Sequence, residues 1–445
     1  MSEPTNIDPG VPELLHLEKI TPVQWLILVL GMIASMVEGF DIVIIAYTAP
    51  AISQDWGISP KELGLVFSAG LFGMTLGAML LSWLADVYGR RIIVTATLAI
   101  AGVATCGVMY AHTVTELIVL RAIAGLALGV LVATLPPLVG EFSPRKHRTL
   151  IISALIAAAS FGAVIGGFAS AAVIENYGWK IIFLYAGITT VVLAALIYAV
   201  VPESIAFTSS RNDSDALAKV NRTLSYLRQA TVDKLPPVSA EKKESATVVS
   251  LLTPHRRVTT LLSWTAFFFG FVVVYFITSW MPQVLVAGGL TQAQALQATA
   301  VIPLGSIAGT ILVGWLGKFW PLSRVVAVGF LIGSVCIFVI SGMLSDLAGK
   351  PFELVWLMLL LIGIFLMGAF SNLYAIAMIV YPVQVRSTGL GWSAGLGRAG
   401  AVISPLLAGW LLSLGLTMPV LFVLFATPAI VSAICAGFIK MREMA

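Results

Sequence analysis

Long runs of apolar residues follow one another along the chain, separated by short polar breaks. A helix needs about 20 mostly apolar residues to cross a bilayer, and these runs lack the period-two alternation of membrane β-strands. The pattern therefore predicts twelve transmembrane helices. The expected spans in the first half are 23–50, 59–84, 92–111, 115–140, 150–174 and 178–201. Those in the second half are 257–285, 291–317, 324–345, 352–380, 387–413 and 417–440.

The composition supports a chain that is dissolved in lipid. Of the 445 residues, 59% are hydrophobic and 10% are charged, whereas about 25% of residues are charged in ordinary soluble domains. The mean hydropathy is +1.00. We therefore expect an all-α integral membrane protein, surrounded by the bilayer, that has no nucleic-acid partner.

The longest polar stretch, 202–256, divides the apolar runs six and six. Scattered charges, serines and prolines are typical of a linker, and residues 215–228 could form a short surface helix within it. The expected organisation is an N-terminal tail at 1–22, a six-helix bundle at 23–201, the linker at 202–256, a second six-helix bundle at 257–440 and a tail at 441–445.

The basic residues predict the orientation, because lysine and arginine collect in cytoplasmic loops. If the N-terminus is inside, only Lys61, Lys180 and Lys350 fall outside, and the other loop and tail cations fall inside. Both termini and the linker are then cytoplasmic. We expect a multi-pass protein of the plasma membrane, which in a bacterium is the inner membrane.

Few ionisable residues lie inside the predicted helices. Such groups are costly at membrane depth and often mark functional sites. The first helix carries Glu38 and Asp41, the fourth carries Arg121, and the eleventh carries Arg398. No acidic residue lies deep in the last six helices. A carboxylate that takes up a proton at mid-depth should therefore be Glu38 or Asp41, which share one helix face at i and i+3.

These charges suggest separate roles. Asp41 and Arg121 are at similar depths, so we expect them to lie close together, with Asp41 mostly ionised. Glu38 is then the better candidate for reversible protonation. The planar fork of Arg398 suits a substrate carboxylate, and Arg121 is a second candidate for substrate binding. The alternative is that these charges only fix helix packing and register.

The seventh helix is rich in aromatic residues, most of which would face lipid or pack against other helices. A subset could instead stack on a substrate ring and bind its hydroxyl groups, together with polar residues of later helices. The candidates for this pocket are Tyr275, Asn372, Tyr374 and Trp392.

The two halves echo each other after their second helices, where Gly314-Trp315-Leu316-Gly317-Lys318 corresponds to part of Ser82-Trp83-Leu84-Ala85-Asp86-Val87-Tyr88-Gly89-Arg90-Arg91. The longer segment resembles the signature G-x-L-A-D-R-x-G-R-K of the major facilitator superfamily. Further matches are Arg121 with Gly125, Glu141-x-x-Pro144-x-x-x-Arg148, Gly162-x-x-x-Gly166-Gly167 and Pro202-Glu203-Ser204. The resemblance implies two pseudo-symmetric six-helix halves and transport by alternating access.

Charged residues at the predicted cytoplasmic ends of helices form a candidate gate. A charge network there would lock the outward-open state and break on inward opening, and the alternative is that these residues only anchor the topology. The candidate gate residues are Asp86, Arg90, Arg91, Glu141, Arg148 and Arg386.

A narrower resemblance is to the aromatic acid:proton symporter branch. It rests on Glu38-Gly39-Phe40-Asp41 in the first helix and on the segment from Tyr381 to Gly389, followed by Trp392 and Gly397-Arg398. The branch often has Asp where this chain has Glu38. The resemblance implies import of benzoate-type carboxylates with a proton. The proton gradient would supply the energy, and no cofactor is expected.

The leading hypothesis is proton-coupled uptake of a small, hydroxybenzoate-like aromatic carboxylate by a monomer. No G-x-x-x-x-G-K-[ST] phosphate loop appears, so ATP is not expected as the energy source. The histidines lie at helix ends or in loops, so an enzyme is not expected. The alternatives are a symporter for a non-aromatic carboxylate such as a dicarboxylate or muconate, a drug/proton antiporter, and a transporter-like solute receptor.

Overall fold

The computed structural model describes residues 20–211, 215–235, 248–347, 349–382 and 385–439. Twelve helices in these ranges are long and apolar enough to cross a membrane, which confirms the expected number. The C-terminal tail at 441–445, nearly all of the predicted N-terminal tail and part of the segment from Tyr381 to Gly389 lie outside the described residues.

Helices α1 to α7 form the first group. They are α1 (Pro22–Trp56), α2 (Pro60–Leu76, continued by a π-helical turn at Gly77–Leu81), the short α3 (Leu84–Tyr88), α4 (Arg90–Gly107), α5 (Val114–Glu141), α6 (Arg148–Tyr177) and α7 (Lys180–Val200). Helix α1 is longer than its predicted span, because Pro50 is accommodated inside it and the left-handed Gly57 ends it.

Helices α11 to α17 form the second group. They are α11 (Arg257–Ala287), α12 (Gln292–Leu316), α13 (Leu322–Met343), α14 (Phe352–Leu361) and α15 (Gly368–Val380), which a π-helical segment at Ile362–Met367 joins into one span, α16 (Arg386–Ser413) and α17 (Met418–Phe438). Several membrane helices of both groups begin with a capping box, in which a Ser or Thr side chain and a Glu or Gln three residues later satisfy backbone N–H groups.

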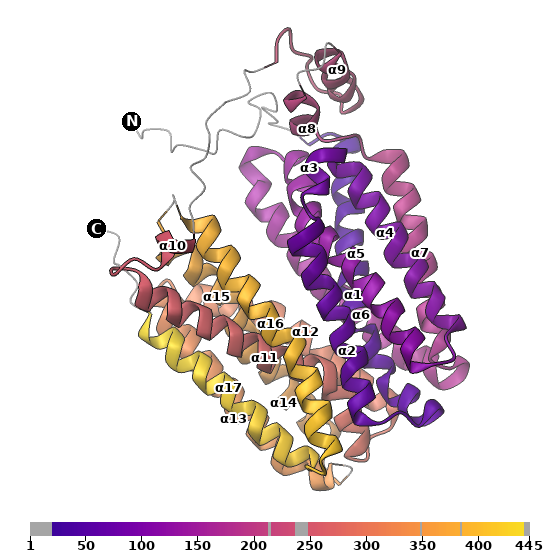
Figure 1. Ribbon diagram of the computed structural model, residues 1–445, viewed down its shortest axis with the longest axis vertical. Helices are drawn as coiled ribbons and strands as arrows, with labels where there is room; N and C mark the ends of the chain where they lie inside the picture. The colour runs from indigo at the N-terminus through magenta and orange to yellow at the C-terminus, as the bar shows by residue number, and fades with distance from the viewer. Residues whose placement is uncertain (1–19, 212–214, 236–247, 348, 383–384, 440–445) are drawn as a thin grey trace.

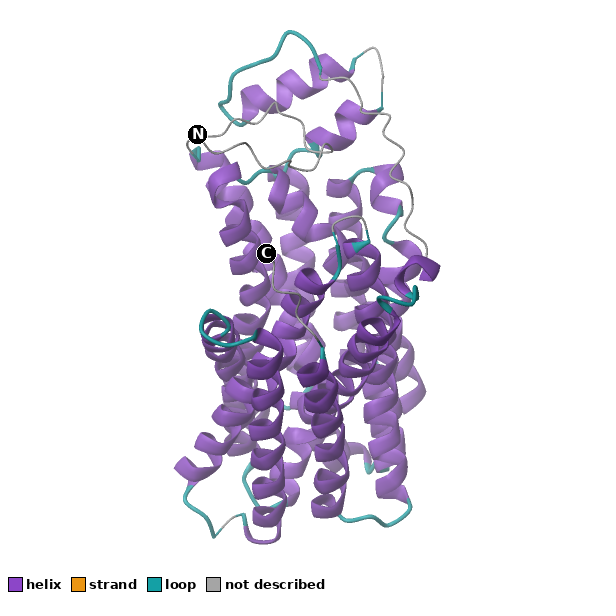
Figure 2. Ribbon diagram, turned by 90° about the vertical axis from the view of Figure 1, so that its left-hand side faces the viewer, coloured by secondary structure: helices purple, strands orange, loops and turns teal. Residues whose placement is uncertain are grey.

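The described parts of the linker contain three short helices: α8 (Ile205–Ser210), α9 (Ala216–Tyr226) and α10 (Val248–Leu251). Helices α8 and α9 lie against the end of the first group at which α1 begins, and α10 lies by the second group (Figures 1 and 2). We call this end of the molecule the linker end. The turn between α1 and α2 lies at the opposite end. Helix α9 matches the surface helix expected at 215–228.

Helices α1 and α6 touch backbone to backbone. A Cβ atom at Gly39 would lie 2.0 Å from the Ala159 carbonyl oxygen, and one at Gly162 would lie 1.8 Å from that of Met36. Only glycine permits such an approach. Gly39 therefore admits a neighbouring helix, and this contact fixes the position of Glu38 next to it.

The two groups join at the opposite end. The Ser68 hydroxyl of α2 donates to the Val402 carbonyl of α16 at 2.7 Å, and the ring of Phe67 packs edge-on against that of Trp280 at 5.4 Å. Helix α6 likewise packs on α12 at Gly167, where a Cβ would lie 2.6 Å from that of Ala300. These contacts hold the two groups together far from the linker.

Toward the linker end the two groups spread apart (Figure 1). The first turns of α16 agree with this arrangement, because a Cβ added at Gly391 or Gly395 would meet no atom within 4 Å. The structure is therefore closed at the opposite end and open at the linker end.

Candidate functional site

Asp41 lies inside the first group of helices and is only 4% exposed. Its Oδ1 accepts a hydrogen bond from Arg121 Nη1 at 2.9 Å, and its Oδ2 accepts one from the Thr105 hydroxyl at 2.7 Å. Arg121 Nη2 also donates to Thr105 Oγ1 at 2.8 Å. The expected proximity of Asp41 and Arg121 is confirmed. Together with Thr105, the two residues link α1, α4 and α5.

Arg121 is enclosed by this network. It is 3% exposed, and its guanidinium lies 5.4 Å from the ring centroid of Phe183. Its Nε is buried without a hydrogen-bond partner among the described residues. With both terminal nitrogens already bonded, Arg121 has little capacity left to hold a ligand in this conformation.

Glu38 has a different environment, although it is only one turn from Asp41. It is 8% exposed, and within the described part of the chain no hydrogen bond or ion pair involves its side chain. The charged groups that act on it electrostatically are Arg398 of α16 and Asp41. Glu38 is thus a nearly buried carboxylate that interacts across the junction with the second group of helices.

Arg398 is the matching charge on the other side of the junction. It is partly exposed, and it too has no hydrogen bond or ion pair within the described ranges. It shares one face of α16 with Gly391 and Gly395, at i−7 and i−3, and space is open at both glycines. The Arg398 side chain therefore lies on the face that opens toward the linker end.

Aromatic rings from α11 and α15 gather beside Arg398. We call Phe267, Phe271, Tyr275, Phe370 and Tyr374 the aromatic cluster. Phe271 stacks on Tyr275 at 5.8 Å and meets Phe370 edge-on at 4.8 Å, and Phe267 meets Tyr374 edge-on at 5.0 Å.

Two observations join this cluster to the arginine. A Cβ at Gly397 would lie 2.4 Å from the Phe271 ring, so the α16 backbone touches the cluster directly before Arg398. Arg398 also acts electrostatically on both Tyr275 and Tyr374. A guanidinium, two phenol hydroxyls and several ring faces are thus close together.

The other two predicted pocket residues lie elsewhere. Trp392 is 43% exposed and packs near Trp264, with ring centroids 6.1 Å apart. It lies about 9 Å before Arg398 along α16 and on a different face of that helix. The amide nitrogen of Asn372 donates to the carbonyls of Thr310 and Gly368 at 3.2 and 2.9 Å. Asn372 thus ties α15 to α12, and neither residue joins the aromatic cluster.

A cavity of about 200 Å³ lies between the two groups of helices, and one of its lining residues, Gly39, directly follows Glu38 in the chain. Gly39 and Tyr47 line it from α1, and Thr278, Thr299 and Ser306 line it from α11 and α12. The sequence pattern alone does not predict this hydroxyl-lined space.

Two of the candidate gate residues, Arg90 and Arg91, contact carboxylates at the linker end, but only Arg90 does so through its side chain. Arg90 forms an ion pair with Glu141, whose other oxygen accepts a hydrogen bond from the Ser204 hydroxyl at 2.6 Å. Arg91 donates from its backbone to Glu203 at 3.0 Å. Glu203 and Ser204 belong to the motif after the sixth predicted helix, and they connect this motif to the ends of α4 and α5.

The remaining gate candidates make no contact across the two groups. Asp86 is exposed and has no ion pair among the described residues. The buried Nε of Arg148 has no hydrogen-bond partner there, and Arg386 donates to the Tyr381 carbonyl of its own group at 3.2 Å. This lack of cross-contacts in the described ranges fits the separation of the groups at the linker end.

Comparison with known proteins gives a consistent result. Residues 31–393 match the Major Facilitator Superfamily. A gallate transporter of Pseudomonas putida is 32% identical over 439 residues, covering 98% of this chain and 96% of that protein. A 4-hydroxybenzoate transporter, PcaK, of Pseudomonas aeruginosa is 30% identical, covering 91% and 90%. A crystal structure of a D-xylose-proton symporter aligns with a TM-score of 0.71 at 17% identity, covering 94% and 98%.

The Asp41–Arg121 pair yields a prediction about stability. Arg121→Leu should destabilise the protein strongly, by about 3–5 kcal/mol, because it leaves a buried carboxylate without its partner. The double variant Asp41→Asn with Arg121→Leu should recover much of that loss. Thermal unfolding of the purified variants in detergent measures both effects, with Arg324→Leu as the control for loss of an exposed arginine. Additive losses in the double variant would contradict the pairing.

Proposed function

Because the chain belongs to the major facilitator superfamily, a family of membrane transporters, we propose that it imports a small aromatic carboxylate together with a proton. The observation that carries the proposal is the opposition of Glu38 and Arg398 across the junction of the two halves. Neither charge is engaged by a fixed hydrogen-bonding partner in the described chain, so both are available to a proton and a substrate.

Arg398 and the aromatic cluster together suit an aromatic acid. A guanidinium binds a carboxylate through two parallel hydrogen bonds, and the partly exposed rings of the cluster, those of Tyr275, Phe370 and Tyr374, offer faces for stacking. Tyr275 and Tyr374 add hydroxyl groups that could recognise ring substituents. The relatives named as gallate and 4-hydroxybenzoate transporters support this substrate class.

Charge balance explains how substrate and proton are coupled. The empty site holds one guanidinium and the Glu38 carboxylate, so its formal charge is zero. A substrate anion alone would leave a net negative charge between the halves, which is costly in a low-dielectric interior. A proton on Glu38 restores neutrality. The site is then neutral only when it is empty or when it holds both substrate and proton. The two halves should therefore close readily only around these two states.

The open end determines which state the structure represents. With the expected orientation, the linker end faces the cytoplasm, so the site is open inward. Closure at that end would bring the candidate gate residues of the two halves together, Asp86 and Arg386 among them. Asp41 and Arg121 remain paired throughout and keep α1 rigid. The proposed setting is the bacterial inner membrane, with cytoplasmic termini and a monomeric transporter.

Other cargoes fit these residues less well. A cationic drug would meet an arginine at the centre of its path, and a non-aromatic acid would leave the aromatic cluster without a stacking partner. Arg398 and the cluster together favour the aromatic carboxylate.

Proton coupling through Glu38 is tested by uptake into proteoliposomes. With labelled gallate or 4-hydroxybenzoate and an imposed inward proton gradient, Glu38→Gln should abolish accumulation, because the amide cannot exchange a proton. Exchange of internal for external substrate should persist, since the amide resembles the protonated acid. The matched control is Glu353→Gln, at an exposed carboxylate. Unimpaired accumulation by Glu38→Gln would exclude Glu38 as the proton carrier.

The role of Arg398 is tested by substrate chemistry. Arg398→Ala should weaken binding of an aromatic carboxylate by roughly tenfold to a hundredfold, because a charge-assisted bond is lost. Binding of the matching carboxamide should change much less. Arg324→Ala, at an exposed arginine of the same half, should leave both affinities unchanged. If Arg398→Ala weakens acid and amide equally, the arginine serves packing and not carboxylate recognition.

A further inference from the structure

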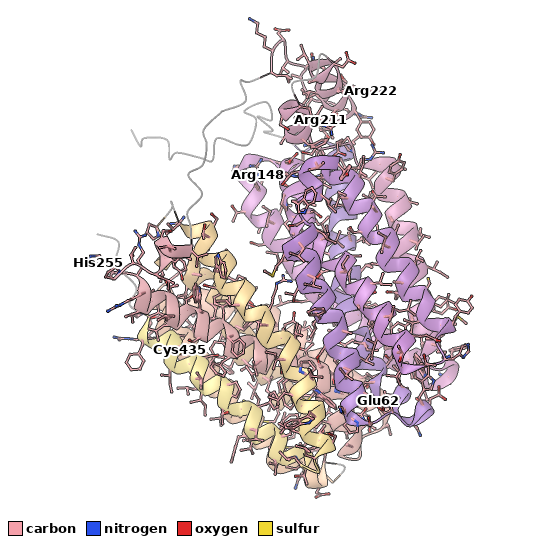
Figure 3. All side chains as sticks on the ribbon, viewed as in Figure 1. Glu62, Arg148, Arg211, Arg222, His255 and Cys435 are labelled. Carbon is pink, nitrogen blue, oxygen red and sulfur yellow. The ribbon has the colours of Figure 1, made fainter. Side chains whose placement is uncertain are left out.

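A second cavity, of about 580 Å³, lies at the linker end, outside the proposed transport path. It is formed where the last turn of α7 and the first turn of α4 meet the linker helices α8 and α9. Its described lining residues include four cationic side chains, Arg91, Arg211, Lys219 and Arg222, and one carboxylate, Glu203. Figure 3 labels Arg211 and Arg222 at this end.

Helix α9 forms one wall of the cavity and is firmly seated. Its apolar side buries Val220 and Leu224 in the core of the first half, and the Tyr226 hydroxyl donates to the Val200 carbonyl of α7 at 2.9 Å. The opposite side therefore presents Lys219 and Arg222 to the cavity at i and i+3. The basic wall is part of the fold and not a chance feature of a loop.

Among the described lining residues, the single carboxylate does not balance the positive charge of the cavity. Glu203 already accepts hydrogen bonds from the backbone N–H groups of Arg91 and Ser204, at 3.0 and 2.9 Å. Arg222 is exposed and has no interaction within the described residues. The Arg91 guanidinium lies 4.4 Å from the Tyr198 ring centroid, and its Nε is buried without a partner in the same ranges. Arg91 Nη2 donates to the Tyr198 carbonyl at 2.5 Å, and Arg211 Nη2 donates to the Val87 carbonyl at 3.0 Å. The donors left for an anion are the remaining guanidinium N–H groups, above all those of Arg222.

The position of the cavity indicates which kind of anion it would bind, because the cavity adjoins an apolar surface of α7. On α7, Val192, Leu196 and Ala199 are exposed at i, i+4 and i+7 and form one apolar stripe. The stripe ends at the cavity, which Ala199 itself lines. An acyl chain lying along the stripe would bring its phosphate to the arginines, as in basic pockets at the cytoplasmic ends of membrane helices.

We infer that this cavity binds the phosphate headgroup of an anionic phospholipid. Arg211 and Arg222 supply charge-assisted hydrogen bonds to the phosphate, and the α7 stripe holds an acyl chain. Such a lipid would bridge the linker to the ends of α4 and α7. The inference is independent of the transported substrate.

The test uses the full-length protein in nanodiscs of phosphatidylcholine that contain a small fraction of fluorescent phosphatidylglycerol. The wild-type protein should bind phosphatidylglycerol in preference to fluorescent phosphatidylcholine. The double variant Arg211→Gln with Arg222→Gln should weaken this binding at least about tenfold, because each cation near the membrane surface contributes to anionic-lipid affinity. Arg222→Gln alone, at a side chain without described contacts, should weaken it severalfold without risk to folding.

The matched control is Lys234→Gln with Arg257→Gln, which removes two cations from the linker end outside the cavity and should leave the affinity within about twofold. Equal weakening by both double variants would reduce the effect to general surface attraction and overturn the site. No preference for phosphatidylglycerol over phosphatidylcholine would also overturn it. Competition by sn-glycerol 1-phosphate at the same concentration as the lipid would identify a soluble phosphate ligand and exclude the lipid.

Discussion

The proposed transport mechanism depends on two opposite charges that lie in different halves and form no direct ion pair in the described part of the chain. Glu38 and Arg398 act on each other electrostatically across the junction, yet neither is bonded within the described chain. A buried ion pair with ideal geometry would be hard to separate. Charges held apart by their own helices can instead accept a ligand or a proton between them.

Holding the charges apart requires rigid helices on both sides. In the first half, α1 contacts α6 through Gly39 and Gly162, and the Asp41–Arg121–Thr105 network fixes it to α4 and α5. In the second half, the aromatic cluster packs against α16 at Gly397. Each half is thus cohesive on its own, while the contacts between halves named above lie toward the opposite end. That distribution of contacts is what two rocking bodies need.

Much of this was predictable from the sequence. Apolar run length alone yields the twelve helices, because the bilayer imposes a minimum span. Depth along the predicted helices was enough to pair Asp41 with Arg121. The family motifs identified Arg90 and Glu141 as gate residues, and the structure joins them in an ion pair; their role in gating stays a prediction.

The remaining features depend on which face each helix turns toward its neighbours. The length and order of the apolar runs do not reveal that orientation. Trp392 was grouped with Tyr275 by residue type, but its position on α16 turns it away from Arg398. Phe370 was missed, although its i, i+4 spacing with Tyr374 was a usable signal. Thr105 had no signal, since a hydroxyl in a membrane helix more often bonds its own backbone, and here it bonds Asp41.

A structure with bound gallate or 4-hydroxybenzoate would show whether Arg398 and the aromatic cluster form the substrate site opposite Glu38. We expect the substrate carboxylate within hydrogen-bond distance of the Arg398 guanidinium and the ring against Tyr275, Phe370 or Tyr374. A substrate bound away from Arg398, or one whose carboxylate points to lipid, would contradict this assignment.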